Sequence, residues 1–151
     1  IDIDTSFVEA YFSMAVAYEK LKKQDTALQY FNKTLDLDAK SSKSLLHIGM
    51  INDDKKNYGK AIESYKKAIT IDANYEVVHY NLGNIYLKQN KLEEAIKAYE
   101  NAIAAKGDYA KPYVNLANCY MRTGDTTKAQ TLFRKAIELD PSLQQKARKA
   151  K

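Results

Sequence analysis

Asparagine residues recur in this sequence at a spacing that could bind the backbone of another peptide. The interval from Asn81 to Asn115 is the same as the interval from Asn84 to Asn118. An asparagine amide carries both a hydrogen-bond donor and an acceptor, so it can pair with both groups of a peptide bond. Stacked repeats would give two short rows that hold an extended chain without reading its side chains. The alternative is that these amides bond to neighbouring helices, and the spacing leaves both interpretations open.

Basic residues accompany the asparagines in the second half of the chain. Lys88, Lys111 and Arg122 occupy this side of the expected helices, where the first half instead mixes acidic and basic residues, such as Glu19 and Lys20. Lysine and arginine donors form strong charge-assisted hydrogen bonds with carboxylates. The pattern therefore predicts a partner with an acidic segment or a terminal carboxylate that lies against the second half.

A third set of residues on this side is apolar. It consists of Phe12, Leu46, Tyr80 and Val114, which follow one another at the interval that separates the asparagines. An amphipathic helix normally carries polar residues opposite its packed stripe. We therefore expect an apolar groove that binds a partner, and the alternative is partial burial of this side by neighbouring repeats.

Residues that could catalyse a reaction or bind a metal ion lack the necessary arrangement. His47 and His79 fall on different helix faces, and His79 is expected in the core. Asp53 and Asp54 are adjacent, so on a helix their side chains diverge by about 100° and cannot face each other as an acid–base pair. Cys119 is predicted to be a small buried residue rather than a nucleophile. We expect no enzymatic activity, no metal site and no cofactor.

All these residues belong to one sequence unit that recurs four times without an insertion. Its markers are small and aromatic residues at fixed places. Small residues occur at Ala15, Gly49, Gly83 and Ala117, and again at Ala27, Ala61, Ala95 and Ala129. Aromatic residues occur at Phe31, Tyr65, Tyr99 and Phe133. The small residues let two helix backbones approach closely, and the aromatic ring fills the remaining space.

Each unit is predicted to be a helix, a short turn and a second helix. With the first residue of a unit as position 1, the apolar stripe of the first helix falls at positions 4, 7, 8 and 11. The stripe of the second helix falls at positions 20, 21, 24, 27 and 28. One hairpin cannot bury both stripes, so the hairpins must stack on each other.

This pattern resembles the tetratricopeptide repeat (TPR), a helical hairpin of about 34 residues. The residues that carry the resemblance are Tyr11, Ala15, Tyr18, Ala27 and Phe31, and then Tyr113, Leu116, Ala117, Tyr120, Ala129, Phe133, Ala136 and Pro141. The resemblance implies an all-α fold, a right-handed α-solenoid with a concave groove lined by the first helices, and a role in protein interaction. Asn52, Lys56 and Thr34 depart from the family pattern.

The predicted domain organisation follows from this register. Residues 1–7 form the tail of a preceding repeat, because Ile1 to Asp4 match the end of the first repeat at Leu35 to Asp38. Four repeats follow at 8–41, 42–75, 76–109 and 110–143. Residues 144–151 are predicted to begin a polar capping helix.

Composition limits the kinds of partner. The net charge of +5 comes mostly from scattered lysines, which does not favour nucleic-acid binding, since that would need a clustered basic stripe. The sequence contains no run of 18 apolar residues, so a membrane span is not expected. A single cysteine fits a reducing intracellular compartment, and we expect the cytoplasm.

The sequence thus predicts a protein-interaction scaffold, a module of a larger protein that binds a peptide or a partner protein in its groove. The alternative is the substrate-recognition arm of an enzyme, for example a glycosyltransferase, whose catalytic domain lies outside this chain. Self-association through an open N-terminal edge at Ile1, Ile3 and Phe7 is a further expectation.

Overall fold

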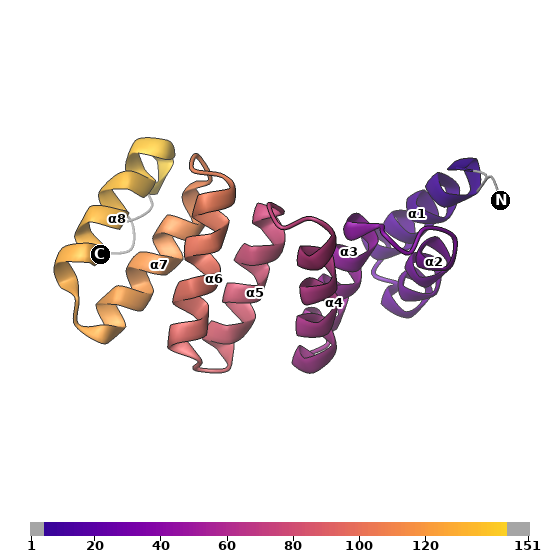
Figure 1. Ribbon diagram of the computed structural model, residues 1–151, viewed down its shortest axis with the longest axis horizontal. Coiled ribbons are helices and arrows are strands. Elements are labelled where there is room, and N and C mark those ends of the chain that lie inside the picture. Colours follow the sequence, from indigo (N-terminus) through magenta and orange to yellow (C-terminus); the bar gives the residue numbers. More distant parts are fainter. Residues whose placement is uncertain (1–4, 145–151) are drawn as a thin grey trace. The chain divides into compact units, whose positions relative to one another are not determined.

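The computed structural model describes residues 5–144 (Figure 1). Their helices are α1 (Thr5–Lys20), α2 (Gln24–Leu37), α3 (Ser42–Asp54), α4 (Tyr58–Ile71), α5 (Glu76–Lys88), α6 (Leu92–Ala105), α7 (Ala110–Thr123) and α8 (Thr126–Leu139). The expected repeat tail in residues 1–4 and most of the expected capping helix, residues 145–151, lie outside the described residues.

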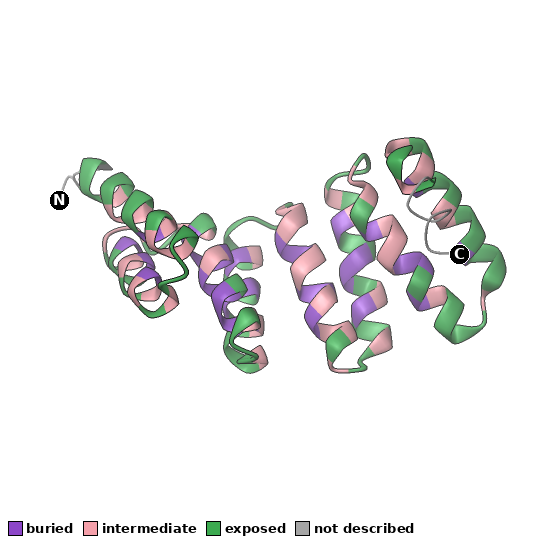
Figure 2. Ribbon diagram, turned by 180° about the vertical axis from the view of Figure 1, so that it is seen from behind, coloured by how far each residue is buried: buried purple, intermediate pink, exposed green. Residues whose placement is uncertain are grey.

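The helices pack in consecutive pairs, each of which is a hairpin: α1 with α2, α3 with α4, α5 with α6, and α7 with α8. The chain divides into two compact units, one with α1–α4 and one with α5–α8. Within the first unit α2 packs on α3, and within the second α6 packs on α7. Each unit is therefore a stack of two hairpins, with its buried residues on the sides that neighbouring helices cover (Figure 2).

The turn inside each hairpin contains one residue with a left-handed backbone, always at the same place in the repeat. These residues are Lys22, Lys56, Asn90 and Gly124, with φ angles of 61°, 60°, 60° and 86°. Glycine adopts this conformation freely, whereas an L side chain raises its free energy by about 1–2 kcal/mol. Lys56, which stands where the family prefers glycine, thus makes the same turn without one.

Gly49 and Gly83 allow the two helices of their hairpins to approach closely. A Cβ atom on Gly49 would lie 2.3 Å from Cε1 of Tyr65, and one on Gly83 would lie 2.6 Å from Cε1 of Tyr99. Both tyrosines are fully buried. The aromatic ring therefore packs directly on the glycine backbone, which is the close contact that the sequence pattern predicts.

Two polar departures from the family pattern are buried with their hydrogen bonds satisfied. Asn52 Nδ2 donates to the carbonyl of Ile48 over 2.9 Å, and Thr34 Oγ1 donates to the carbonyl of Tyr30 over 3.0 Å. Each bond returns to the backbone one turn earlier in the same helix, so neither side chain leaves these groups unpaired in the core. His79 is also buried, as its place on the packed stripe predicts.

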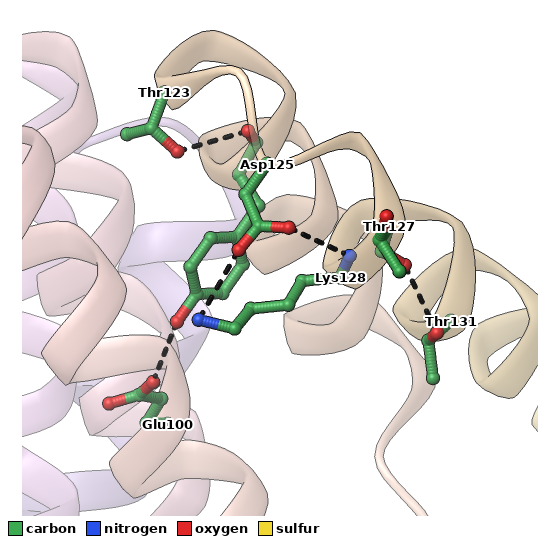
Figure 3. A network of polar contacts seen from close by, with 7 residues as sticks. Glu100, Thr123, Asp125, Thr127, Lys128 and Thr131 are labelled. Carbon is green, nitrogen blue, oxygen red and sulfur yellow. Dashed lines mark hydrogen bonds and ion pairs between the residues drawn. The ribbon is translucent and has the colours of Figure 1, made fainter.

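Polar contacts at the turn between α7 and α8 connect these helices with α6 (Figure 3). Asp125 begins α8 as its N-cap, accepting a hydrogen bond from the Lys128 backbone N–H over 3.1 Å. The Lys128 ammonium lies 3.3 Å from the Asp125 carboxylate and 5.0 Å above the Tyr120 ring. Tyr120 in turn donates its hydroxyl hydrogen to Glu100 of α6 over 3.2 Å. The backbone bond from Lys128 lowers the pKa of Asp125, which keeps this cap ionised.

Candidate functional site

Most of the predicted site residues lie on one side of α5 and α7, in the second unit. We call this side the first-helix face. It consists of Tyr80, Asn81, Asn84 and Lys88 on α5, and of Lys111, Val114, Asn115, Asn118 and Arg122 on α7. At 100° per residue, the named positions of each helix fall within an arc of about 100°, so these side chains share one face.

Asn84 and Asn115 meet at the centre of the first-helix face. Asn115 Nδ2 donates to Asn84 Oδ1 over 2.9 Å. The hydroxyl of Tyr99, which comes from α6, donates to the same oxygen over 2.8 Å and accepts a hydrogen bond from Asn115 Nδ2 over 3.3 Å. The two amides are half-buried, and burial raises the pKa of Tyr99 above its ordinary value, so its hydroxyl stays a donor.

This network changes the expected picture of the asparagine rows. The predicted rows join Asn81 to Asn115 and Asn84 to Asn118, whereas the hydrogen bond joins Asn84 to Asn115, a member of the other row. The alternative in which the amides bond to neighbouring helices therefore holds for these two residues. Asn81 is half-buried and Asn118 is exposed beside them. The sequence pattern did not predict that the Tyr99 hydroxyl would bond to Asn84. The signal for a polar contact was a tyrosine at a place where two other repeats have Phe31 and Phe133.

Aromatic and apolar side chains lie at one end of the face. The Tyr80 ring packs edge-on against Tyr109, with ring centroids 5.4 Å apart. Burial and the proximity of Tyr80 raise the pKa of Tyr109 to about 12. A shallow cavity of about 130 Å³ opens here, lined by Tyr80, Ala110, Lys111, Val114, Asn115, Asp140 and Leu143. Asp140 places an acidic residue beside Lys111, which sequence reasoning did not foresee because Asp140 follows α8.

The three predicted cations occupy two separate places. Lys88 ends α5 and Arg122 lies in the last turn of α7, where it donates a hydrogen bond to Asn90 Oδ1. Lys111 lies in the first turn of α7. Eleven residues of helix separate Lys111 from Arg122, a rise of roughly 16 Å at 1.5 Å per residue. A single carboxylate cannot reach all three, but an acidic segment several residues long can.

The corresponding side of the first unit has a different chemistry. Phe12 is half-buried with its ring 5.7 Å from Phe31, and Leu46 is buried and leaves little surface for a partner. His47 stacks on Phe31 at 4.9 Å, and its Nδ1 lies 2.7 Å from Glu19 Oε2. Sequence reasoning missed this pair. The first unit therefore uses an aromatic-packed histidine and a glutamate where the second has its asparagine pair.

The side chains that could act as a nucleophile or as metal ligands are Cys119 and the histidine and acidic residues. Cys119 is a buried free cysteine, and burial raises the pKa of its thiol. In the part of the chain that the structure describes, no three His, Cys, Asp or Glu side chains gather as metal ligands would. Across residues 5–144, no helix has the length and apolar character that a membrane crossing requires.

Comparison with known families assigns most of the sequence to one kind of repeat. A family model described as "TPR repeat" matches residues 54–90. Two models described as "Tetratricopeptide repeat" match residues 8–41 and 86–151. A comparison with curated protein sequences finds no match.

Solved structures share this fold. A crystal structure of MamA aligns with a TM-score of 0.83 and 25% identity over 94% of this chain and 83% of that chain. The Pseudomonas aeruginosa PilF structure aligns with a TM-score of 0.81 and 20% identity over 91% of this chain and 63% of that chain. An O-GlcNAc transferase mutant of Thermobaculum terrenum aligns with a TM-score of 0.70 and 22% identity. This match covers 78% of this chain but only 22% of that enzyme. The expected all-α repeat fold is confirmed, and the last two likenesses concern the fold alone.

Proposed function

This chain belongs to the tetratricopeptide-repeat family, whose members are protein-interaction scaffolds, and we propose that it binds an extended, acidic segment of a partner protein on the first-helix face of α5 and α7. The observation that carries the proposal is the group of asparagines on that face. Asn81, Asn84 and Asn115 are half-buried and Asn118 is exposed. Their amides suit the donor and acceptor of a peptide bond.

Charge supports an acidic rather than a neutral segment. Lys88 and Arg122 stand at one end of the face, and Lys111 stands at the other, so cations lie at both ends of the asparagine group. Exposed charges of this kind attract a complementary segment and raise its association rate more than they raise its final affinity. Asp140 lines the same cavity as Lys111, and its negative charge reduces the positive potential at that end of the face. The acidic residues of the partner are therefore expected mainly near Lys88 and Arg122.

A peptide titration tests the proposal. The probe is a fluorescein-labelled hexapeptide of alternating alanine and glutamate with a free terminal carboxylate. Replacing both Asn81 and Asn118 by alanine is expected to weaken its binding about 30-fold, because two hydrogen bonds of about 1 kcal/mol each are lost. Fluorescence anisotropy measures the affinity.

The matched control replaces Asn101 and Gln130, which are exposed on α6 and α8, by alanine. The control should bind as the wild type does. Absence of binding by the wild type at low salt, or an equal loss in the control, would contradict the proposed site.

The second candidate is the recognition arm of an enzyme, with this chain presenting substrate to a catalytic domain elsewhere in the protein. Its support is the likeness of fold to part of the Thermobaculum terrenum O-GlcNAc transferase, of which this fold occupies a small share. Both candidates use the same face, so the sequence on either side of these repeats in the whole protein distinguishes them. We place either function in a reducing intracellular compartment, the cytoplasm, because Cys119 is a buried free thiol.

Self-association is proposed from the exposed side of α1. Phe7, Met14 and Leu21 follow one another at intervals of seven residues, and 56%, 40% and 65% of their surfaces are exposed. At the place of Met14 in the repeat, α3 has Ile48 and α7 has Leu116, which are 8% and 3% exposed. Each of those two helices packs on the second helix of the preceding hairpin, and among the described residues no helix covers the same side of α1.

Sedimentation velocity tests this association. The wild-type mass is expected to rise with concentration, and Met14→Lys should abolish the rise because a charge then lies in the apolar stripe. A wild-type mass that stays monomeric at every concentration would refute self-association.

A further inference from the structure

An apolar cavity of about 330 Å³ lies against α8 in the second unit. The residues that line it are all apolar, and they are Val114, Phe133, Ala136, Ile137 and Leu143. Phe133 is half-buried, whereas the aromatic rings at the same place in the first and third repeats, Phe31 and Tyr99, are fully buried. Within residues 5–144, α8 therefore has the apolar side of α2 and α6 but less cover over it.

Inside each unit, the first helix of the next hairpin covers this side. α3 packs on α2, and α7 packs on α6. Positions 3, 7 and 10 of the repeat are buried in both covering helices, and they are Ser44, Ile48 and Ile51 in α3 and Pro112, Leu116 and Cys119 in α7. Ile48 shares a core cluster with Phe31 of α2, and Leu116 shares one with Tyr99 of α6. These two junctions show what kind of surface the side of α8 can receive.

α1 carries a surface of that kind. Ala10, Met14 and Ala17 stand at positions 3, 7 and 10 of the first repeat, and all three are exposed. Met14 thus occupies the place of Ile48 and Leu116, the residues that pack on the preceding hairpin. The alanines on either side of Met14 let another helix approach closely, as small residues do at helix contacts. α1 therefore has the apolar surface with which a first helix packs on a second helix.

The residues that follow α8 offer no large apolar side chain for this cavity. In the frame of the next repeat, position 3 falls on Lys146 and position 7 falls on Ala150. At the inner junctions, position 7 carries isoleucine or leucine. An alanine methyl group makes far fewer contacts than these side chains, so it would leave most of the cavity empty. Met14 of a second copy has the length to fill it.

We infer that the chain associates head to tail, with α1 of one copy packed on α8 of a second copy and Met14 seated in the cavity beside Phe133 and Ile137. The inference rests on the proposed self-association and adds the surface that receives α1. The two surfaces are different, so the contact is heterologous, and each new copy brings another free surface. Association therefore continues beyond a dimer, as an open chain of copies or as a closed ring.

Two substitutions test the two surfaces separately. Met14→Lys places a charge on α1, and Ile137→Lys places one in the cavity on α8, where an ammonium group is costly to desolvate. In sedimentation velocity, the wild type should reach masses above twice that of the monomer. Each variant alone should stay monomeric at concentrations at least about tenfold higher than those at which the wild type associates.

An equimolar mixture of the two variants gives the decisive result. The Met14→Lys copy keeps its cavity on α8, and the Ile137→Lys copy keeps its surface on α1. The mixture should therefore form a dimer with one copy of each variant. No larger species should appear, because the α1 surface and the α8 cavity that remain free in this dimer both carry the substituted lysine.

The controls add the same charge to other sides of the same helices. Ser13 and Thr131 are exposed, and their side chains are turned from Met14 and Ile137 by about 100° and about 120°. Ser13→Lys and Thr131→Lys should associate as the wild type does. Circular dichroism checks that Ile137→Lys is folded. If its helical signal is reduced, Leu143→Lys, which alters the same cavity beyond the end of α8, takes its place.

Two outcomes would overturn the inference while the proposed self-association stands. One is wild-type association of a folded Ile137→Lys protein, as expected if α1 packs on α1 of the second copy or if residues 145–151 occupy the cavity. The other is a mixture that stays monomeric although each variant alone is monomeric. A monomeric wild type, or undiminished association of Met14→Lys, would overturn the proposed self-association as well.

Discussion

Replacing Gly83 by alanine is expected to lower the free energy of unfolding by about 1–2 kcal/mol, as measured by urea denaturation. On an exposed helix the same change would stabilise by up to about 1 kcal/mol, because alanine favours the helix more than glycine does. Here the added Cβ would lie 2.6 Å from Cε1 of Tyr99 and 2.8 Å from Cδ1. The ring is fully buried and cannot move aside without disturbing its neighbours, so overpacking outweighs the gain in helix propensity.

The chain supplies matched controls for this change. In its own repeats, alanine at this place accompanies phenylalanine, as in Ala117 and Phe133, whereas glycine accompanies tyrosine. Gly83→Ala combined with Tyr99→Phe copies that pairing, and it should recover part of the lost stability because the ring is no longer held by its hydroxyl. Ala117→Gly should cost about 1–2 kcal/mol, because glycine has the lower helix propensity and the buried methyl group of Ala117 is lost. A more stable Gly83→Ala protein would show that the contact with Tyr99 is not tight.

Reversing the three cations of the first-helix face is expected to abolish binding of the acidic hexapeptide. The variant changes Lys88, Lys111 and Arg122 to glutamate, so that attraction at both ends of the face becomes repulsion. We expect at least a 100-fold loss of affinity at low salt, where screening of exposed charges is weakest. Anisotropy titration measures the loss, and added salt should reduce the difference between the variant and the wild type.

A control variant separates local from overall charge. Lys97, Arg134 and Lys135 are exposed on α6 and α8. Changing these three to glutamate also replaces two lysines and one arginine, but away from the first-helix face. Either triple variant takes the net charge from +5 to −1, since each of three substitutions subtracts two charges. An equal loss of binding in both variants would mean that overall charge, and not the first-helix face, attracts the peptide. Unchanged affinity in the Lys88, Lys111 and Arg122 variant would exclude these cations from the site.

The regular spacing of small and aromatic residues was enough to predict the helical hairpins. An unbroken repeat period fixes the stripe of each helix, and stripes that one hairpin cannot bury require stacking. The pairing of glycine with tyrosine and of alanine with phenylalanine was also readable in the sequence, although its meaning depends on how closely Tyr65 and Tyr99 approach the glycines. The left-handed turns at Lys22 and Lys56 run against the local propensity of lysine, and only their register with Gly124 in the repeat indicates them.

The candidate site was predicted less completely than the fold. Periodicity indicates which residues share a helix face, so the asparagines and the cations could be assigned to one side of α5 and α7. It does not indicate which residues of neighbouring repeats meet, since that depends on how the helices cross. For this reason the hydrogen bond between Asn84 and Asn115 departs from the predicted rows, and the contact between His47 and Glu19 was not foreseen.

The central claim is that a peptide lies on the first-helix face of α5 and α7. The most direct measurement is NMR observation of the asparagine side-chain amides while the alanine–glutamate hexapeptide is added. We predict saturable shifts for Asn81, Asn84, Asn115 and Asn118, together with backbone shifts in α5 and α7, all with one dissociation constant. Shifts confined to α6 and α8, or asparagine signals that stay unchanged while the peptide binds, would contradict the account.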